Sequence, residues 1–199
     1  MIAARFSILA ALVAAAQMVA AAPTSSAPPP PPAAQVNAAP PADKIVTRIQ
    51  CSDYLVTKQL KVAQGDSDAQ AASLSSDSPA LLQTGGDSVK VLFTECKSNI
   101  LDVNSSGNTH YGILATAENK DQCFAAPTLN KDNEQIQVVP CSFSDDSSQL
   151  VQFWKYDEKS GDITFVGRTG GGKPYNTGVQ DKKVTVSANA DGNATLSLD

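Results

Sequence analysis

The sequence is poor in histidine, aromatic residues and charge. It contains one His and one Trp among 199 residues, with 6% aromatic and 18% charged residues. A single His rules out most enzyme designs that depend on a histidine base and its partners. The formal net charge of −5 provides no basic excess to neutralise phosphates. We therefore expect neither nucleic acid nor a membrane surface as a partner.

No apolar run is long enough to span a membrane. The run at residues 6–16 ends before Gln17, whereas a spanning helix needs about 20 apolar residues. It follows Arg5 and precedes the small residues at 19–23, which is the order of a secretory signal peptide. Cleavage after Ala21 makes residues 1–21 the signal peptide. We predict a secreted, extracellular protein, with a membrane anchor as the less favoured alternative.

Proline is concentrated in one short segment. Residues 22–43 hold eight of the twelve prolines, including the run at 28–32. Such a segment lacks the apolar bulk for a core and prefers extended polyproline II, so it predicts a disordered Pro/Ala-rich linker. A proline-rich ligand, an O-glycosylated stalk with Thr24, Ser25 and Ser26 as acceptors, and an unstructured leader all stay open. The folded domain is then residues 44–199.

Alternating apolar residues dominate this domain. They recur with a period of two around residues 60–62, 89–93, 136–138, 151–153, 163–165, 184–186 and 196–198. Alternation gives each strand one apolar face, and clusters of Gly, Pro, Asn, Asp and Ser separate the segments. Only residues 67–82 also fit a partial helix. The sequence predicts an all-β fold, either a barrel or a sandwich.

A faint internal repeat favours the barrel. Three β units begin with similar short segments, which end at Leu60, Ile113 and Ile163. These residues are 53 and 50 positions apart. Three β units of near-equal length, none able to bury its apolar face alone, have to close around a shared core. This arrangement predicts a β-trefoil of three four-stranded units.

Residues 122–156 carry an ordered set of motifs. Cys123 and Phe124 begin the set, the strand IQVVPC at 136–141 follows, and Gln152-Phe153-Trp154 completes it as a Q-x-W motif. This unit resembles a repeat of the ricin-B-type lectin family and is similar to uncharacterised secreted fungal ricin-B-like proteins. The resemblance implies a β-trefoil that binds sugars, often galactosides, in shallow sites. Together with the strand alternation, it implies that Trp154 belongs to the core, and Gln152 and Trp154 form a structural motif.

The residues that the family uses to bind sugar are replaced in this unit. Sugar-binding relatives place an Asp shortly after the first Cys, an aromatic residue on the strand before the second Cys, and an Asn before the Gln of Q-x-W. Ala125, Val138 and Val151 stand at these places. A sugar needs hydrogen-bonding groups and a flat face on which to stack. The resemblance therefore supports the fold better than the lectin activity, and the sugar-binding residues stay unknown.

Four cysteines permit three disulfide connectivities. Cys123 and Cys141 are 18 residues apart and flank two expected neighbouring strands, which favours their pairing. Cys51 and Cys96 are then left to join the start of the domain to the end of its first unit. There is no C-x-x-C motif, and His110 is far from each Cys in sequence. We therefore expect no metal site and no cofactor.

Motifs for catalysis are weak or missing. Residues 167–174 (GRTGGGKP) nearly match a phosphate-binding loop, but Pro174 replaces its Ser or Thr and no helical pattern follows. The G-x-S-x-G motif is absent. His110 has no nucleophile or acid near it in sequence, which favours a solvated turn. The acidic segment 144–147 is interpreted as a solvated loop, with weak calcium or sugar binding as the lesser alternative.

These observations predict a secreted, monomeric binding protein that is not an enzyme. The expected partner is an extracellular or cell-wall glycan, bound at a site other than that of the family. The alternatives are a secreted protein partner, as for a protease inhibitor or an effector, and a glycosidase with an unrecognised pair of carboxylates. Sequons at Asn104 and Asn193 predict surface glycosylation.

Overall fold

A computed structural model describes residues 47–129, 131–167, 175–188 and 192–199. All of them belong to the second of the two units into which the chain divides, Asp43–Asp199. The predicted signal peptide, the predicted linker and residues 168–174 of the loop-like GRTGGGKP segment lie outside the described residues. None of the described helices is long and apolar enough to cross a membrane.

Strands are the main regular structure of the described part of the chain, which confirms the all-β prediction. A single short 3-10 helix, η1, interrupts them there. The elements are β1 (Gln50–Gln64), β2 (Gln70–Leu74), β3 (Leu82–Thr84), β4 (Lys90–Lys97), β5 (Thr109–Thr116), β6 (Gln122–Ala125), β7 (Glu134–Gln135), β8 (Gln137–Pro140), η1 (Ser147–Val151), β9 (Phe153–Asp157), β10 (Asp162–Phe165), β11 (Asn176–Gln180), β12 (Lys183–Ser187) and β13 (Ala194–Leu198).

The partial helix allowed at residues 67–82 does not form. Strand β2 occupies part of this stretch and pairs with both β1 and β3. The hydroxyl of Ser75 accepts hydrogen bonds from the backbone N–H groups of Asp77 and Leu81 at 3.3 and 2.9 Å. Serine side chains that bond to nearby backbone groups compete with helix formation. Strand pairing and this turn together exclude the helix.

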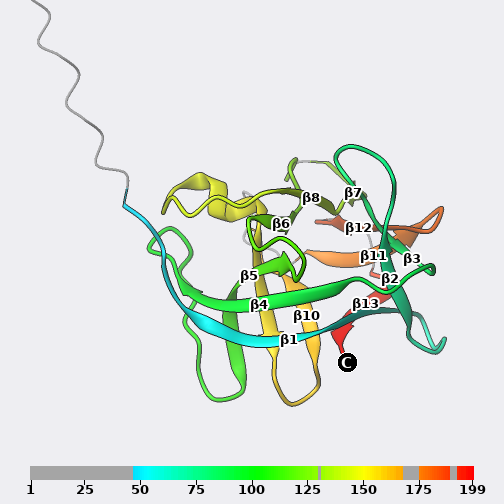
Figure 1. Cartoon of the computed structure of the whole chain (residues 1–199), viewed down its shortest axis with the longest axis horizontal. Helices are drawn as coiled ribbons and strands as arrows, with labels where there is room; N and C mark the ends of the chain where they lie inside the picture. Colours follow the sequence, from blue (N-terminus) through cyan, green and yellow to red (C-terminus); the bar gives the residue numbers. More distant parts are fainter. Residues whose placement is uncertain (1–46, 130, 168–174, 189–191) are drawn as a thin grey trace, which may run out of the picture. The chain divides into compact units, whose positions relative to one another are not determined.

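Six strands close a barrel (Figure 1). Their order around it is β1, β4, β5, β9, β10 and β13, each antiparallel to its neighbours, with β13 paired back to β1. The outer hairpins β2–β3, β6–β8 and β11–β12 each follow one barrel strand and precede the next. Closure gives every barrel strand a partner on both sides, so no edge is left open to solvent.

The three predicted repeat openings lie on β1, β5 and β10. Leu60 and Ile163 face the main core, whereas Ile113 belongs to a second apolar cluster. Because successive side chains of a strand point to opposite faces, Leu114 takes the core position on β5. The predicted repeat is therefore one residue out of phase in the middle unit.

Trp154 is fully buried in the main core, as predicted. Its indole Nε1–H donates a hydrogen bond to the carbonyl oxygen of Phe124 at 2.9 Å. Its ring meets that of Phe165 edge-on, with the ring centroids 5.1 Å apart. The indole thus buries its full apolar area while its one polar atom is satisfied.

Both predicted disulfides are present. Cys51–Cys96 joins directly opposed residues of β1 and β4, and Cys123–Cys141 joins β6 to the residue after β8. Cys96 and Cys123 are buried in the second apolar cluster with Ile113, on the outer side of β4 and β5. Two disulfides are consistent with an extracellular protein.

Candidate functional site

The three family positions for sugar binding offer no polar group in this protein. Ala125 on β6 is fully buried, whereas Val138 on β8 and Val151 at the end of η1 are half-buried. Val138 lines a surface hollow, but Ala125 is shielded from any ligand. The structure therefore does not assemble the family's sugar site around these residues.

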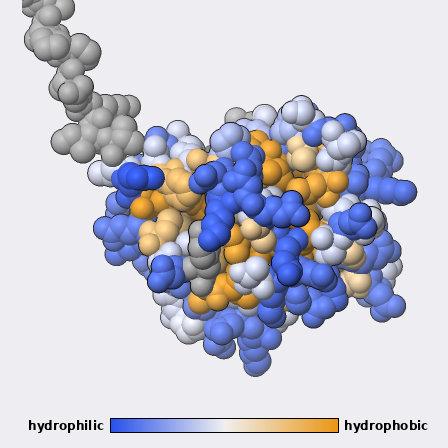
Figure 2. Space-filling view, viewed as in Figure 1, coloured by the Kyte–Doolittle hydropathy of each residue, from blue (hydrophilic) through white to orange (hydrophobic). Residues whose placement is uncertain are grey.

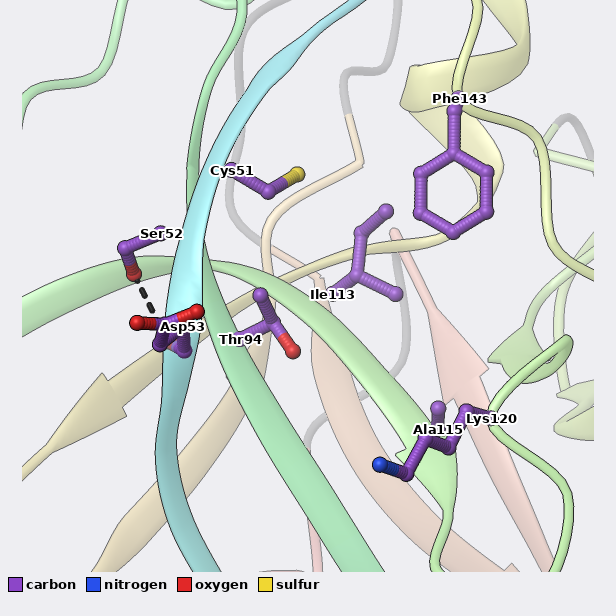
Figure 3. A pocket seen from close by; sticks show the side chains of 8 residues that line it. All are labelled: Cys51, Ser52, Asp53, Thr94, Ile113, Ala115, Lys120 and Phe143. Atoms are coloured by element: carbon purple, nitrogen blue, oxygen red, sulfur yellow. Dashed lines mark hydrogen bonds between the residues drawn. The ribbon is translucent and has the colours of Figure 1, made fainter.

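A different set of residues forms a hollow on the outer side of the barrel (Figure 3). We name it the Phe143 hollow, and its volume is about 230 Å³. A hydrophobic ring, aliphatic side chains, hydroxyls, a carboxylate and an ammonium group surround one space. The lining residues are Cys51, Ser52, Asp53, Thr94, Ile113, Ala115, Lys120 and Phe143.

The strand register explains the floor of the Phe143 hollow. Thr94 on β4 lies directly opposite Ile113 on β5. Ile113 and Ala115 are two residues apart, so they share the face of β5 that points away from the barrel interior. The hydroxyl of Thr94 makes no hydrogen bond with any described residue. This polar group is therefore available to a ligand above an apolar floor.

A bulge on β1 supplies the polar rim. The pairing of β1 with β4 shifts register after Cys51, so Ser52 and Asp53 lie in an irregular stretch of the strand. Bulges change the direction in which side chains point. The Ser52 hydroxyl lies 2.9 Å from the carbonyl oxygen of Asp53 and 3.3 Å from that of Glu95. Both exposed side chains consequently border the hollow (Figure 3).

Backbone contacts and a cation–π contact hold Phe143. Its carbonyl oxygen accepts the N–H of Ile49 at 3.0 Å, and the guanidinium carbon of Arg48 lies 5.8 Å from its ring centroid. The side-chain amide of Gln152 binds both backbone groups of Ser142, accepting the N–H at 3.0 Å and donating to the carbonyl oxygen. The Q-x-W glutamine therefore fixes the residue that precedes Phe143.

The acidic segment after Phe143 differs from the predicted solvated loop. Asp146 is exposed and caps η1, but Asp145 is buried. The Asp145 carboxylate accepts hydrogen bonds from the Ser98 hydroxyl at 2.7 Å and from the Asn99 backbone and side-chain amides at 3.0 and 2.6 Å. Its own N–H donates to the Thr47 carbonyl oxygen at 2.7 Å. Through its carboxylate and its backbone N–H, Asp145 therefore joins three separate segments of the chain.

Replacing Asp145 with asparagine is expected to weaken the acid dependence of stability. Burial raises the pKa of Asp145, but hydrogen bonds from Ser98 and Asn99 outweigh burial and hold the pKa below its ordinary value of 3.8. A carboxyl group with a lowered pKa contributes stability above its unfolded-state pKa, and loses it as the pH falls through the folded-state pKa. The free energy of unfolding, measured with urea from about pH 6 to about pH 2, should fall less steeply with pH for Asp145→Asn than for the wild type. The exposed Asp102→Asn is the control, and equal slopes for Asp145→Asn and the wild type would contradict this role.

A second hollow borders the turn between β5 and β6. We name it the Glu118 hollow, and its volume is about 350 Å³. Its lining includes acidic, basic and amide side chains around an aliphatic base. The lining residues are Leu74, Asp87, Ser88, Val89, Lys90, Thr116, Glu118, Asn119, Gln122 and Val138.

His110 is not the solvated turn residue that the sequence predicted. It lies on β5 with 14% of its side chain exposed. Its Nδ1 is 2.7 Å from a Glu95 carboxylate oxygen, its Nε2 is 3.5 Å from Glu158, and its ring stacks on Tyr156 at 6.2 Å. Burial raises the pKa of the Tyr156 hydroxyl, with smaller contributions from the carboxylates nearby. Within the described residues no hydroxyl or thiol bonds to the imidazole, so this group lacks the geometry of an activated nucleophile.

Both predicted glycosylation sites are exposed, but their surroundings differ. Asn104 lies in the loop between β4 and β5. Asn193 immediately precedes β13, and its Oδ1 accepts the Val179 N–H at 2.9 Å. Across the described residues, no three His, Cys, Asp or Glu side chains gather into a group that could hold a metal ion.

Phe143 was not predicted as a site residue, although the sequence around it contains a signal. An aromatic residue in the otherwise polar stretch Ser142–Asp146 has no strand pattern to place it in the core. No sequence pattern relates Phe143 to Asp53 or Lys120, because the bulge on β1 and the closure of the barrel bring them together.

The comparisons with known proteins returned no similarity. No family model matches the chain, and no curated protein or solved structure matches it significantly. The case for function accordingly depends on this chain's own residues.

Proposed function

We propose that the protein is a secreted, non-catalytic, monomeric glycan-binding protein of the ricin-B type with a β-trefoil fold. Three features support the fold: a closed six-stranded barrel, one outer hairpin within each of three units, and contacts between hairpins of different units. The two disulfides and the signal-peptide pattern support secretion.

The glycan site that we propose is the Phe143 hollow, and the observation that carries the proposal is that an aromatic ring, Phe143, and a carboxylate, Asp53, line the same hollow. Sugar rings stack on aromatic faces and present hydroxyls to carboxylates and hydroxyls. The hollow combines these groups on a barrel stiffened by a disulfide that runs through Cys51. Its volume of about 230 Å³ is below the roughly 300–1,000 Å³ of drug-sized pockets, which suits a single sugar ring.

The chemistry of this hollow favours binding over hydrolysis. Glycoside hydrolysis uses a pair of carboxylates on either side of the scissile bond. Among the described lining residues, Asp53 is the one carboxylate at the Phe143 hollow. We therefore assign Asp53 to hydrogen bonding with sugar hydroxyls, and expect bound oligosaccharides to be recovered intact.

The proposal is tested by a glycan array followed by calorimetric titration of the best ligand. Phe143→Ala and Asp53→Asn should each weaken binding about tenfold, since a stacking contact or a charged hydrogen bond contributes roughly 1–2 kcal/mol. Asp68→Asn, which lies in an exposed turn outside the hollow, should bind normally. Galactose and lactose should show no measurable binding at millimolar concentration, because Ala125, Val138 and Val151 replace the family's polar and stacking residues.

Three results would contradict the proposal. Saturable galactose binding around Ala125 would restore the family's own site. Cleaved oligosaccharide would indicate a glycosidase. Failure to bind any glycan would favour the alternative partner, a secreted protein such as a protease held by the exposed loops.

A further inference from the structure

The two hollows occupy neighbouring stretches of the same strand pair. Thr94 on β4 lines the Phe143 hollow and Lys90 on β4 lines the Glu118 hollow. These residues are four positions apart, so they share one face of the strand. On β5, Ala115 lines the first hollow and the next residue, Thr116, lines the second, so at this strand the hollows lie on opposite faces, with the β5–β6 turn between them. At about 3.3 Å per residue, Lys90 and Thr94 are roughly 13 Å apart along the strand.

One turn supplies side chains to both hollows. The turn between β5 and β6 contributes Lys120 to the Phe143 hollow, and Glu118 and Asn119 to the Glu118 hollow. The Thr116 hydroxyl donates to the Asn119 carbonyl oxygen at 2.8 Å, and the Asn119 carboxamide accepts the N–H of Asp121 at 3.1 Å. These bonds fix the turn, so the spacing of the two hollows is built into the fold. Apolar surface, in orange, interrupts the hydrophilic cover on the face where β1 and β4 lie in front (Figures 1 and 2).

The Glu118 hollow has hydrogen-bonding groups that the fold does not use. Within the described residues, the side chains of Asp87, Glu118 and Gln122 make no hydrogen bond or ion pair. Carboxylates accept hydrogen bonds from sugar hydroxyls, and carboxamides both accept from them and donate to them. The base, formed by Leu74, Val89 and Val138, offers aliphatic contact to a ring face.

We propose that the two hollows are subsites of one site that binds a linear polysaccharide chain along β4 and β5, across the β5–β6 turn. This inference rests on the proposed function and specifies its ligand class. One sugar stacks on Phe143, and a sugar further along the chain hydrogen-bonds to Glu118 and Gln122. The described lining contains three acidic residues, Asp53, Asp87 and Glu118, and only two lysines. We therefore expect the bound polysaccharide to be neutral or to carry amines. A uronate or sulfated chain would be repelled.

The experiment is a calorimetric titration of the full secreted chain with cello- and chito-oligosaccharides from monomer to hexamer. Affinity should rise by about tenfold or more between the dimer and the longer chains, because linking two occupied subsites makes the second contact intramolecular. Glu118→Ala and Gln122→Ala should remove most of this gain while leaving dimer binding unchanged. Phe143→Ala should weaken every length, and the exposed Asp68→Asn should change none.

The outcomes separate this inference from the proposed function. If dimer and hexamer bind equally, and Glu118→Ala changes nothing while Phe143→Ala still weakens binding, the two-subsite inference is wrong and the Phe143 hollow stands. If polygalacturonate binds more tightly than the neutral chains, the assigned ligand class is wrong. If no oligosaccharide of any length binds, both proposals fail together.

Discussion

Replacing Trp154 with alanine is expected to reduce the free energy of unfolding by about 3–5 kcal/mol. The side chain is fully buried, meets Phe165 edge-on and donates its indole N–H to the Phe124 carbonyl oxygen. Alanine removes the ring, leaves a cavity and deprives a buried carbonyl group of its donor. The cost therefore combines lost burial with one lost hydrogen bond.

A second variant at Trp154 separates the lost hydrogen bond from the lost burial, and an exposed leucine serves as a control. Trp154→Phe keeps an aromatic ring but loses the indole N–H, and should cost less than Trp154→Ala. Leu55→Ala removes a side chain that is 40% exposed and should stay within about 0.5 kcal/mol of the wild type. Guanidinium unfolding followed by circular dichroism measures all three. An unchanged midpoint for Trp154→Ala, with ligand binding lost, would instead place this indole at the ligand site.

Removing the Cys51–Cys96 disulfide is expected to cost about 4 kcal/mol in the chain-entropy account. Its two cysteines are 45 residues apart, against 18 for Cys123 and Cys141, and the shorter loop predicts about 3 kcal/mol. Alanine is the suitable replacement, since a serine at the buried Cys96 would add a hydroxyl without a partner.

The Cys51→Ala/Cys96→Ala double variant should also weaken glycan binding. Cys51 directly precedes the bulge that carries Ser52 and Asp53 to the Phe143 hollow. The Cys123→Ala/Cys141→Ala variant is the matched comparison for stability, and the exposed Asp68→Asn, which lies outside the hollow, is the control for binding. Non-reducing unfolding and calorimetric titration test the pair. Wild-type glycan binding by the Cys51→Ala/Cys96→Ala variant would show that this disulfide does not position the site.

The alternation of apolar and polar residues was sufficient to predict many of the strands and core residues from the sequence. Alternation at Val91 and Phe93 predicts a strand with one apolar face, and both residues are buried in the main core. The same alternation placed Trp154 correctly. The phase of the repeat at Ile113 was wrong because both faces of β5 are covered, one by the main core and one by the second apolar cluster. An uninterrupted apolar run such as Ile113-Leu114-Ala115 does not reveal which residue faces inward.

The Phe143 hollow and the environments of two polar residues, His110 and Asp145, were largely hidden from the sequence. His110 contacts Glu95 and Glu158 because β5 pairs with β4 and β9. No local sequence motif predicts these contacts. Asp145 looks like a loop residue, and its burial depends on Ser98, which is 47 positions away. Long-range contacts of this kind arise from barrel closure, which a single sequence does not encode in any short pattern.

Glycan binding at the Phe143 hollow and across the β5–β6 turn to the Glu118 hollow is tested most directly by NMR. Titrating the ¹⁵N-labelled chain with chitohexaose and cellohexaose should shift backbone amide signals of Ser52, Asp53, Thr94 and Phe143 at one end of the site. Signals of Glu118, Lys120 and Gln122 should shift with them, while Ala125 and Val151 stay unchanged. Shifts that centre on Ala125 and Val151, or none from either oligosaccharide, would contradict the account.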